Sequence, residues 1–186
     1  MDDHQLVKDC LKWKPRAQQQ LFEKYSQQML AVCYRYTKSI KDAEDVLQEG
    51  FVKVFFKLDQ YRFEGELGAW IRKIMVNTAL NFLKKDSKYR DEMYFTEQPL
   101  HAVTDEDPAV LLQAKELAEL IRQLPSGYQA IFNLHAVEGF SHVEIGEMLG
   151  INDGTSRSQY ARARALLISW INDASSGKKN KQYGGK

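Results

Sequence analysis

Several features that would point to particular protein classes are scarce in this chain of 186 residues. It has two cysteines and four prolines, which argues against a disulfide-stapled scaffold and against a proline-rich chain. No apolar run approaches the roughly eighteen residues that cross a bilayer, and the polar, acidic start lacks the pattern of a signal peptide. We therefore expect a globular, cytoplasmic protein of one or two domains without membrane insertion; its 44% hydrophobic residues suffice for modest cores.

Metal-ligand patterns are also missing. Cys10 and Cys33 have no partner motif and no close His at a spacing suited to zinc, so we expect buried, reduced thiols. His135 and His142 do not make a metal pair by themselves, and a structural or solvent-facing role is predicted for each. We predict no catalytic residue, no metal and no cofactor.

Charge is distributed in blocks, although the formal net charge is only +1. Residues 1–94 and 122–186 are mildly basic, whereas residues 95–121 are acidic, with two prolines and little apolar periodicity at first. This composition predicts a flexible linker. Its acidity is explained by solvation, or alternatively by mimicry of nucleic acid inside a basic channel.

The N-terminal part has apolar residues at helical spacing. Three stripes with steps of mostly three or four residues predict amphipathic helices: Leu21, Tyr25, Met29, Val32 and Tyr36; Val46, Phe51, Val54, Phe55 and Leu58; and Trp70, Ile74, Ala79, Leu80 and Leu83. Alternating β patterns and hairpin signals are missing, so the predicted fold class is all-α. We predict two small helical domains (residues 1–92 and 113–172), a flexible acidic linker (93–112) and a disordered basic tail (173–186).

The segment 140–167, FSHVEIGEMLGINDGTSRSQYARARALL, predicts two short helices joined by a turn at Gly150. The first helix has an apolar stripe, and the second has four candidate caps: Asn152, Asp153, Thr155 and Ser156. On the second helix a packing face is formed by Tyr160, Ala163 and Leu167, and an outward face by Arg157, Ser158, Ala161 and Arg162.

This pattern is typical of a helix-turn-helix, which places its second helix in the major groove of DNA. Arginine can pair there with guanine, and Ser or Gln can meet base edges or phosphates. DNA contact is therefore the preferred interpretation of the segment. The alternative is an ordinary helical hairpin with a solvated basic face.

A cluster of carboxylates occupies residues 42–49, DAEDVLQE, at the start of a predicted helix. The helix dipole alone could account for Asp42 and Glu44. The dipole accounts less well for Asp45, Gln48 and Glu49. Their spacing places these three residues on one exposed ridge, which suits a basic partner helix.

Cations alternate with aromatic residues in the segment 63–90. Aromatic rings can stack on unpaired bases, cations bind phosphates, and Asn77 and Asn81 on one helical face can reach base edges. Single-stranded nucleic acid binding is therefore predicted, although a core role is an alternative for Trp70 and the preferred one for Phe82. Gly65 and Gly68 are expected to loosen the loop before Trp70, which would let it close around an extruded base.

In this order, the segments resemble the extracytoplasmic-function sigma factors, the small two-domain members of the main bacterial sigma family. The resemblance covers about residues 21–167, and these stretches carry it: DAEDVLQEGFVKVF, WIRKIMVNTALNFLKK, the acidic linker, LPSGYQAIFNLHAVEGFSHVEIGEMLGI and GTSRSQYARARALL. It implies a transcription initiation factor, not an enzyme, which directs core RNA polymerase to specific promoters.

The resemblance also implies a set of contacts. The clamp helices of the polymerase β′ subunit would be bound by Asp42, Asp45, Gln48 and Glu49. The minus-ten element would be melted, and a flipped nontemplate base captured, by Gly65, Trp70, Arg72, Lys73, Asn77 and Asn81. The minus-thirty-five element would be read by Thr155, Arg157, Ser158, Gln159 and Arg162. The β flap and an anti-sigma protein are further implied partners, and the linker would thread near the polymerase cleft.

Some positions depart from the family pattern. Ser156 stands where an apolar residue is usual, Gln159 and Tyr160 where Arg-Leu is common, and Gly146 where Ala is usual. Two other classes compete with the sigma-factor interpretation. A helix-turn-helix regulator of the response-regulator output type would lack the WIRKI-VNTALNF element. An enzyme acting on nucleic acid is disfavoured because the sequence offers no Gly-rich phosphate loop, plausible metal carboxylate pair or nucleophile triad.

Overall fold

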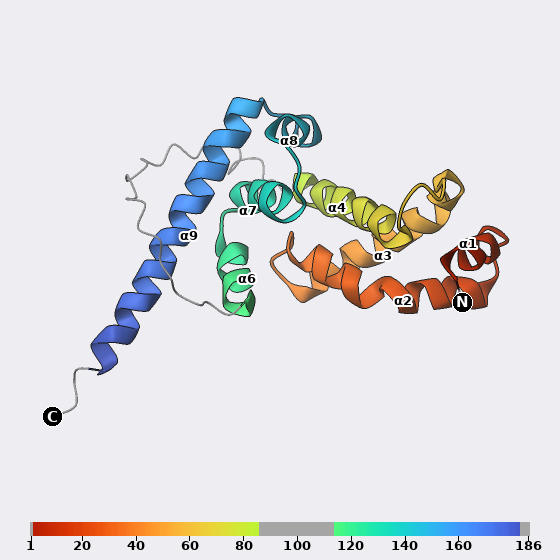
Figure 1. Cartoon of the computed structure of the whole chain (residues 1–186), viewed down its shortest axis with the longest axis horizontal. Helices are drawn as coiled ribbons and strands as arrows, with labels where there is room; N and C mark the ends of the chain where they lie inside the picture. Colours follow the sequence, from red (N-terminus) through yellow and green to blue (C-terminus); the bar gives the residue numbers. More distant parts are fainter. Residues whose placement is uncertain (1, 86–113, 183–186) are drawn as a thin grey trace. The chain divides into compact units, whose positions relative to one another are not determined.

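The computed structural model describes residues 2–85 and 114–182, and every regular element in those ranges is a helix (Figure 1). The helices divide into two compact units, unit 1 within Met1–Asp86 and unit 2 within Ser87–Lys186. The predicted all-α class is thus confirmed. The predicted linker, residues 93–112, lies outside the described residues.

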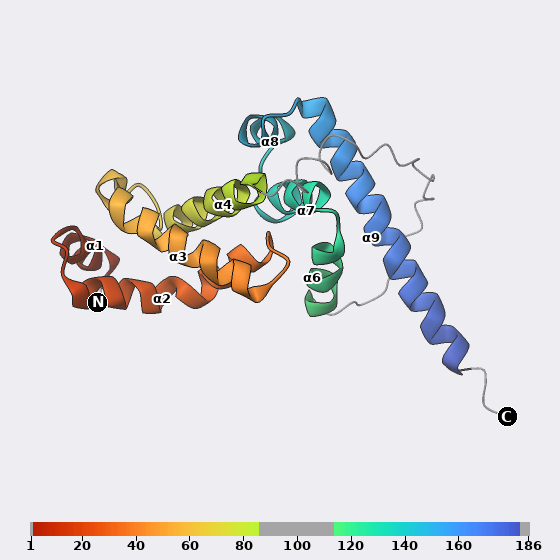
Figure 2. The same cartoon turned by 180° about the vertical axis from the view of Figure 1, so that it is seen from behind.

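Unit 1 has four α-helices and one short 3-10 helix in its described part: α1 (Asp3–Leu11), α2 (Pro15–Tyr34), α3 (Ile40–Lys57), η1 (Leu58–Gln60) and α4 (Leu67–Lys85). Helices α2, α3 and α4 pack against one another, and α1 packs on α2 and η1 (Figure 2). In the first two predicted stripes, every residue is buried in this core except Phe55, which is half-buried. In the third stripe, Ala79, Leu80 and Leu83 are buried, but Trp70 and Ile74 are only half-buried.

Small residues and caps set the geometry of unit 1. Ser39 caps α3, because its hydroxyl accepts a hydrogen bond from the Asp42 backbone N–H at 3.1 Å. Gly50 allows α3 and α4 to pack closely, since an added Cβ there would lie 2.2 Å from Sδ of Met75. Cys10 and Cys33 are buried free thiols, as predicted, and burial raises their pKa values to about 11 and about 12.

Unit 2 consists of α6 (Ala114–Gln123), α7 (Ser126–Phe132), a π-helical turn η2 (Asn133–Val137), α8 (His142–Leu149) and α9 (Asp153–Gln182). One side of α9 packs on α6, α7 and α8. Its core contribution comes from Ala163 and Leu167, which contact Ile121, Leu124 and Tyr128. The predicted packing face of the second helix is therefore confirmed.

The C-terminal end of α9 corrects one prediction. A disordered tail was expected from residue 173, whereas the helix continues to Gln182. Ser, Asn and Gly177 suggest a solvated tail by composition, but a helix that has already formed gains one backbone hydrogen bond for each residue added, and Ala174, Lys and Gln favour the extension. The segment contains no proline that would end the helix.

Candidate nucleic-acid and protein interfaces

The turn between α8 and α9 is built from local side-chain and backbone bonds. Helix α8 begins with a capping box in which Ser141 and Glu144 bond reciprocally to each other's backbone N–H. Gly150 ends it in the left-handed region, at a φ of 74°. Asn152 then caps α9, because its Oδ1 accepts a hydrogen bond from the Thr155 backbone N–H at 2.6 Å. The predicted helix-turn-helix is thus present. Of the four candidate caps for its second helix, Asn152 is the one that caps α9.

Helices α8 and α9 approach each other closely at Gly146. A Cβ atom at this position would lie 2.7 Å from the backbone oxygen of Ile151, in the turn itself. On α8, Ile145 and Leu149 are buried, whereas Met148 is half-buried and Val143 is exposed. The apolar stripe predicted for this helix is therefore only partly a core face.

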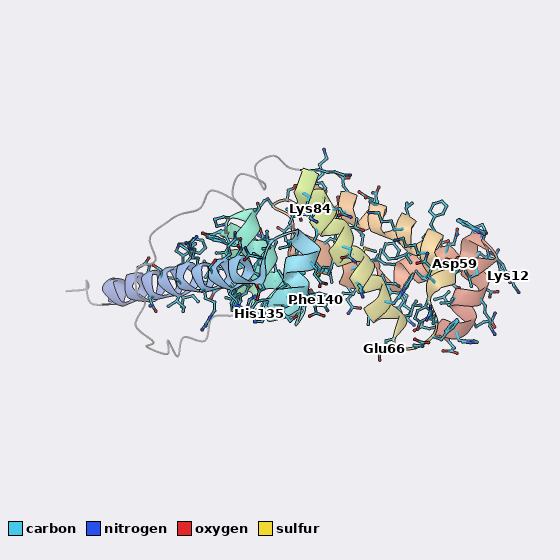
Figure 3. All side chains as sticks on the ribbon, turned by 90° about the horizontal axis from the view of Figure 1, so that it is seen from above. Lys12, Asp59, Glu66, Lys84, His135 and Phe140 are labelled. Carbon is cyan, nitrogen blue, oxygen red and sulfur yellow. The ribbon has the colours of Figure 1, made fainter. Side chains whose placement is uncertain are left out.

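Polar and aromatic side chains hold α9 against the rest of unit 2. Ser156 is fully buried, and its Oγ lies 2.9 Å from Nδ1 of His142. The His142 ring stacks on His135, and the edge of Tyr160 meets the His135 ring at 4.6 Å between centroids. The residues that depart from the family pattern, Ser156 and Tyr160, thus take part in packing. Figure 3 labels His135 beside Phe140, whose backbone oxygen lies 2.8 Å from Nδ1 of His135.

The opposite face of α9 is open to solvent near its N-terminal end. Arg157 and Ser158 are exposed, and Thr155 and Arg162 are half-buried. Arg157 forms an ion pair with Asp153 one turn earlier, which holds the guanidinium beside the helix start. This surface combines cations and hydroxyl groups on one helical face, as major-groove recognition requires.

Gln159 is a correction to the predicted DNA-contact set. Its side chain is only 5% exposed and lies with Ser156 and Ala163 on the packing side of α9. Steps of three and four residues carry one helical face from Ser156 through Gln159 to Ala163. The resemblance placed this residue among the DNA contacts, but the helical register places its side chain inside.

Helix α4 presents a second polar face, in unit 1. Lys73, Asn77 and Asn81 are exposed at successive turns, and Arg72 and Trp70 are half-buried near the start of the helix. The turns from Lys73 to Asn81 place a cation and two amides along one line. In Figure 3, Glu66 marks the segment just before α4 and Lys84 marks the opposite end of the helix.

Two hollows that share Tyr61, Gly65, Glu66 and Ala69 in their lining lie at the segment that precedes α4. One, of about 560 Å³, is lined by Tyr25, Tyr61, Phe63, Gly65 and Arg72 among others. The other, of about 370 Å³, is lined by Tyr61, Gly65, Trp70 and Lys73 among others. Both hollows are large enough for a flat aromatic group and offer ring faces for stacking and a cation for a phosphate, while Glu66 places a carboxylate in the lining of each.

The segment before Trp70 differs from its prediction in extent. Gly65 has a φ of 151° and belongs to a loop, but Gly68 already lies in the first turn of α4 and faces the ring of Tyr25. Trp70 is therefore held by a helix rather than by a loop, with its ring 5.6 Å from that of Tyr61. Phe63 begins the segment predicted to bind single strands, whereas Tyr61 lies just outside it, although an aromatic residue so close to Gly65 was a signal.

The carboxylates of α3 form the ridge that the spacing predicted. Asp45, Gln48 and Glu49 are all exposed on α3. The Lys53 ammonium group, 2.7 Å from the carboxylate of Glu49, holds the pKa of Glu49 below its ordinary value. Asp42 differs from the other three, because it is half-buried and accepts a hydrogen bond from the Ser39 hydroxyl at 2.7 Å, as part of the helix start.

The described residues offer neither a metal site nor a membrane span. Across residues 2–85 and 114–182, no three His, Cys, Asp or Glu side chains gather as they would around a metal ion. None of the helices in these ranges combines the length and apolar character of a membrane span.

Comparison with known proteins identifies both units. Residues 21–89 match sigma-70 region 2, and residues 114–167 match sigma-70 region 4. The RNA polymerase sigma-H factor of Pseudomonas aeruginosa is 30% identical over 178 residues, which cover 89% of this chain and 91% of that protein. The ECF RNA polymerase sigma factor SigW of Bacillus subtilis is 26% identical over 160 residues, which cover 80% of this chain and 86% of that protein.

A solved structure shares the fold. The sigma factor RpoE from Bartonella quintana, in complex with the anti-sigma factor NepR, aligns with a TM-score of 0.52 at 20% identity, covering 83% of this chain and 96% of RpoE. The chain belongs to the extracytoplasmic-function group of the sigma-70 family, whose members are transcription initiation factors. The match to region 2 favours this class over a response-regulator output domain.

Proposed function

We propose that unit 1 attaches this chain to core RNA polymerase and opens the minus-ten element, while unit 2 reads the minus-thirty-five element. The observation that carries this proposal is the separation of three exposed surfaces with different chemistry. The α3 ridge is acidic, the α4 face combines cations with amides, and the start of α9 combines arginines with hydroxyl groups. A protein partner suits the first surface, and DNA suits the other two.

The α3 ridge is proposed to bind the β′ clamp helices through Asp45, Gln48 and Glu49. All three side chains are exposed and lie within two turns of one helix, so a basic helix can meet them together. Asp42 supports this surface indirectly, because its carboxylate is already engaged at the start of α3. The β flap is proposed as a second polymerase contact.

The α4 face is proposed to bind the nontemplate strand after it leaves the duplex. Trp70 and Tyr61 offer ring faces beside the smaller hollow, Lys73 offers a phosphate contact, and Asn77 and Asn81 offer amides for base edges. Capturing an unstacked base shifts the equilibrium toward open DNA, because the free energy of binding offsets the cost of unstacking. This step uses binding free energy and requires no catalytic group.

The start of α9 is proposed to enter the major groove at the minus-thirty-five element. Arg157 and Ser158 are the exposed side chains nearest the helix start, and Thr155 and Arg162 flank them. Because recognition helices contact bases mainly through their N-terminal residues, this set is placed where contact is made. We leave Gln159 out of the set because it is buried.

A cytoplasmic location is proposed because the chain is proposed to act with RNA polymerase. A chain that works with RNA polymerase acts in the cytoplasm. The solved relative RpoE binds an anti-sigma factor, and a regulator of this kind is proposed for this chain as well. Such a protein would compete with polymerase or DNA for the surfaces described above.

Reconstituted transcription tests the function as a whole. Core RNA polymerase with and without this chain is given a library of genomic fragments, and the RNA products are sequenced. We expect new transcripts that start at a shared promoter sequence and appear only when the chain is present. Identical transcript profiles from the two reactions, with a known sigma factor active on the same library, would contradict the proposal.

A further inference from the structure

The turn between α1 and α2 holds an aromatic residue in an unfavourable backbone conformation. Trp13 has a φ of 54°, in the left-handed region that glycine adopts most easily. The turn is fixed by two backbone hydrogen bonds, from Trp13 N–H to the Cys10 oxygen at 2.8 Å and from Lys14 N–H to the Asp9 oxygen at 3.3 Å. The Trp13 side chain is nevertheless 58% exposed, so most of this large apolar group faces solvent. A bulky residue strained in this way and left in solvent points to a role outside folding.

Trp13 does not stand alone on the surface. Its ring lies 5.7 Å from that of Phe56 in an edge-on arrangement, and Phe56 is 69% exposed. One helical turn before Phe56, Val52 is 54% exposed. These three side chains form an apolar patch, which we call the Trp13 patch. Exposed apolar groups that cluster, rather than scatter singly, mark surfaces that bind another molecule.

The Trp13 patch continues the acidic ridge of α3. Steps of three and four residues lead from Asp45 through Glu49 and Val52 to Phe56, so all four lie on one face of the helix. The N-terminal half of this face is acidic and the C-terminal half is apolar. A partner that fits the whole face has cations at one end and apolar side chains at the other.

We propose that the Trp13 patch is the apolar anchor of the polymerase-binding surface. The polymerase element that pairs its cations with Asp45 and Glu49 places an apolar side chain against Trp13 and Phe56. This inference rests on the proposed function, because it assigns the α3 ridge to polymerase. It adds the α1–α2 turn to the interface.

The distribution of charge favours a protein partner over single-stranded nucleic acid. Lys12 and Lys14 flank Trp13, but Lys14 is paired with Asp9 at 2.7 Å. Asp59 lies on η1, which packs against α1, the helix that ends one residue before Lys12. The carboxylates of the continuing ridge would also repel a phosphate backbone along the same face. An apolar anchor beside an acidic ridge instead matches a protein interface, where buried aromatic residues contribute most of the affinity.

The strained turn makes a clean test possible. Trp13→Gly removes the indole and relieves the left-handed backbone, but it also loses the buried part of the side chain and adds freedom to the unfolded chain, so its melting temperature is measured beside its affinity. Phe56→Gln removes the second ring from an exposed position, where a large loss of stability is not expected. Trp13→Phe keeps an aromatic ring in the same turn and serves as the matched control.

The measurement is the dissociation constant of each full-length variant for core RNA polymerase without promoter DNA. We expect Trp13→Gly and Phe56→Gln each to weaken binding by about tenfold or more, and Trp13→Phe to stay within about threefold. If both variants bind like the wild type while Asp45→Arg with Glu49→Arg loses binding, the inference is wrong and the proposed function stands. If the wild type itself does not bind core polymerase, both are wrong. Should Trp13→Gly alone lower the melting temperature, the affinity of Phe56→Gln decides the question.

Discussion

The imidazole rings of His135 and His142 stack with their centroids 4.2 Å apart and their planes 22° from parallel. His135 belongs to η2 and His142 begins α8, so the stack joins two elements of unit 2. Tyr160 and Ser156 extend this contact to α9. The pair thus takes part in fixing the helix that carries the proposed DNA-binding face. At this distance, His135 disfavours a positive charge on the His142 ring.

The stability of unit 2 should therefore depend on pH through His142. Its pKa is lowered by desolvation, by His135 and by Arg157, while Asp153 acts in the opposite direction. A base whose folded pKa lies below its unfolded value binds fewer protons when folded. Its contribution is complete above about pH 6.5, the unfolded pKa, and is lost as the pH falls through the lower folded value. We therefore expect the melting temperature of unit 2 to decrease as the pH is lowered past about 6.5.

Tryptophan fluorescence can report on unit 2 separately. Trp170 packs on the core of this unit, whereas Trp13 and Trp70 belong to unit 1. With Trp13→Phe and Trp70→Phe in place, thermal melts between pH 5 and 8 follow Trp170 alone. Adding His142→Gln removes the titrating ring and should flatten the pH dependence. An equally steep curve in that variant would show that another group is responsible.

Gly146 should be required for the close approach of α8 and the turn. In Gly146→Ala, the new Cβ would lie 2.7 Å from the Ile151 oxygen, and a backbone atom cannot move aside as a flexible side chain can. Overpacking costs about 1–3 kcal/mol, and the better helix propensity of Ala offsets about 1 kcal/mol of it. We expect a net loss of roughly 1 kcal/mol in the free energy of unfolding of unit 2. Glu147→Ala, at an exposed position on the same helix, should change it by less than about 0.5 kcal/mol.

The contrast between Glu49 and Gln159 shows what the sequence could predict. Hydrophobic periodicity located the buried face of α3, so the position of Glu49 on the opposite face followed directly. Gln159 entered the DNA-contact set through the resemblance to the sigma factors, but its register is that of the buried Ser156 and Ala163. A core that uses hydroxyl and amide groups gives no hydrophobic signal. Only the three-dimensional packing reveals it.

Trp13 and Gly68 illustrate a second limit. The left-handed backbone of Trp13 depends on how α1 packs on α2, which no local pattern encodes. Gly68 suggested a loop, yet it lies in α4, where its lack of a side chain leaves room for Tyr25. Glycine permits both a flexible loop and a close helix contact, so its presence alone does not distinguish them.

Arg157 and Arg162 should determine promoter affinity without affecting attachment to polymerase. Replacing both by Ala removes contacts that each contribute about 1–3 kcal/mol when made to bases. We expect holoenzyme to bind a promoter with an intact minus-thirty-five element at least tenfold more weakly, with a shallower salt dependence if phosphates are involved. The variant should bind core polymerase normally. A parallel loss of both affinities would instead indicate that unit 2 has misfolded.

Asp45 and Glu49 should determine attachment to polymerase. The double variant Asp45→Arg with Glu49→Arg reverses the charge of an exposed ridge, so the fold should persist while a basic partner is repelled. We expect binding to core polymerase to weaken by more than about tenfold, with an ordinary melting temperature. Glu23→Arg, a reversal at an exposed position of α2, serves as a comparison for general charge effects. Unchanged binding of the double variant would remove the ridge from the interface.

Trp70 should act in strand opening rather than in promoter binding. Its ring lines the smaller hollow beside Tyr61, and a base stacked on an aromatic ring contributes about 1–3 kcal/mol. Trp70→Ala should therefore reduce open-complex formation on duplex promoters by roughly tenfold or more, as measured by permanganate reactivity of unpaired thymines. On a template with a mismatched, already open minus-ten element, most of the transcription should return, because the unstacking cost is removed. A defect of equal size on both templates would place Trp70 in polymerase attachment or in folding. Asn77→Ala provides the contrast. If Asn77 contacts a base edge, that contact is lost on both templates, so the defect of this variant should persist on the open template.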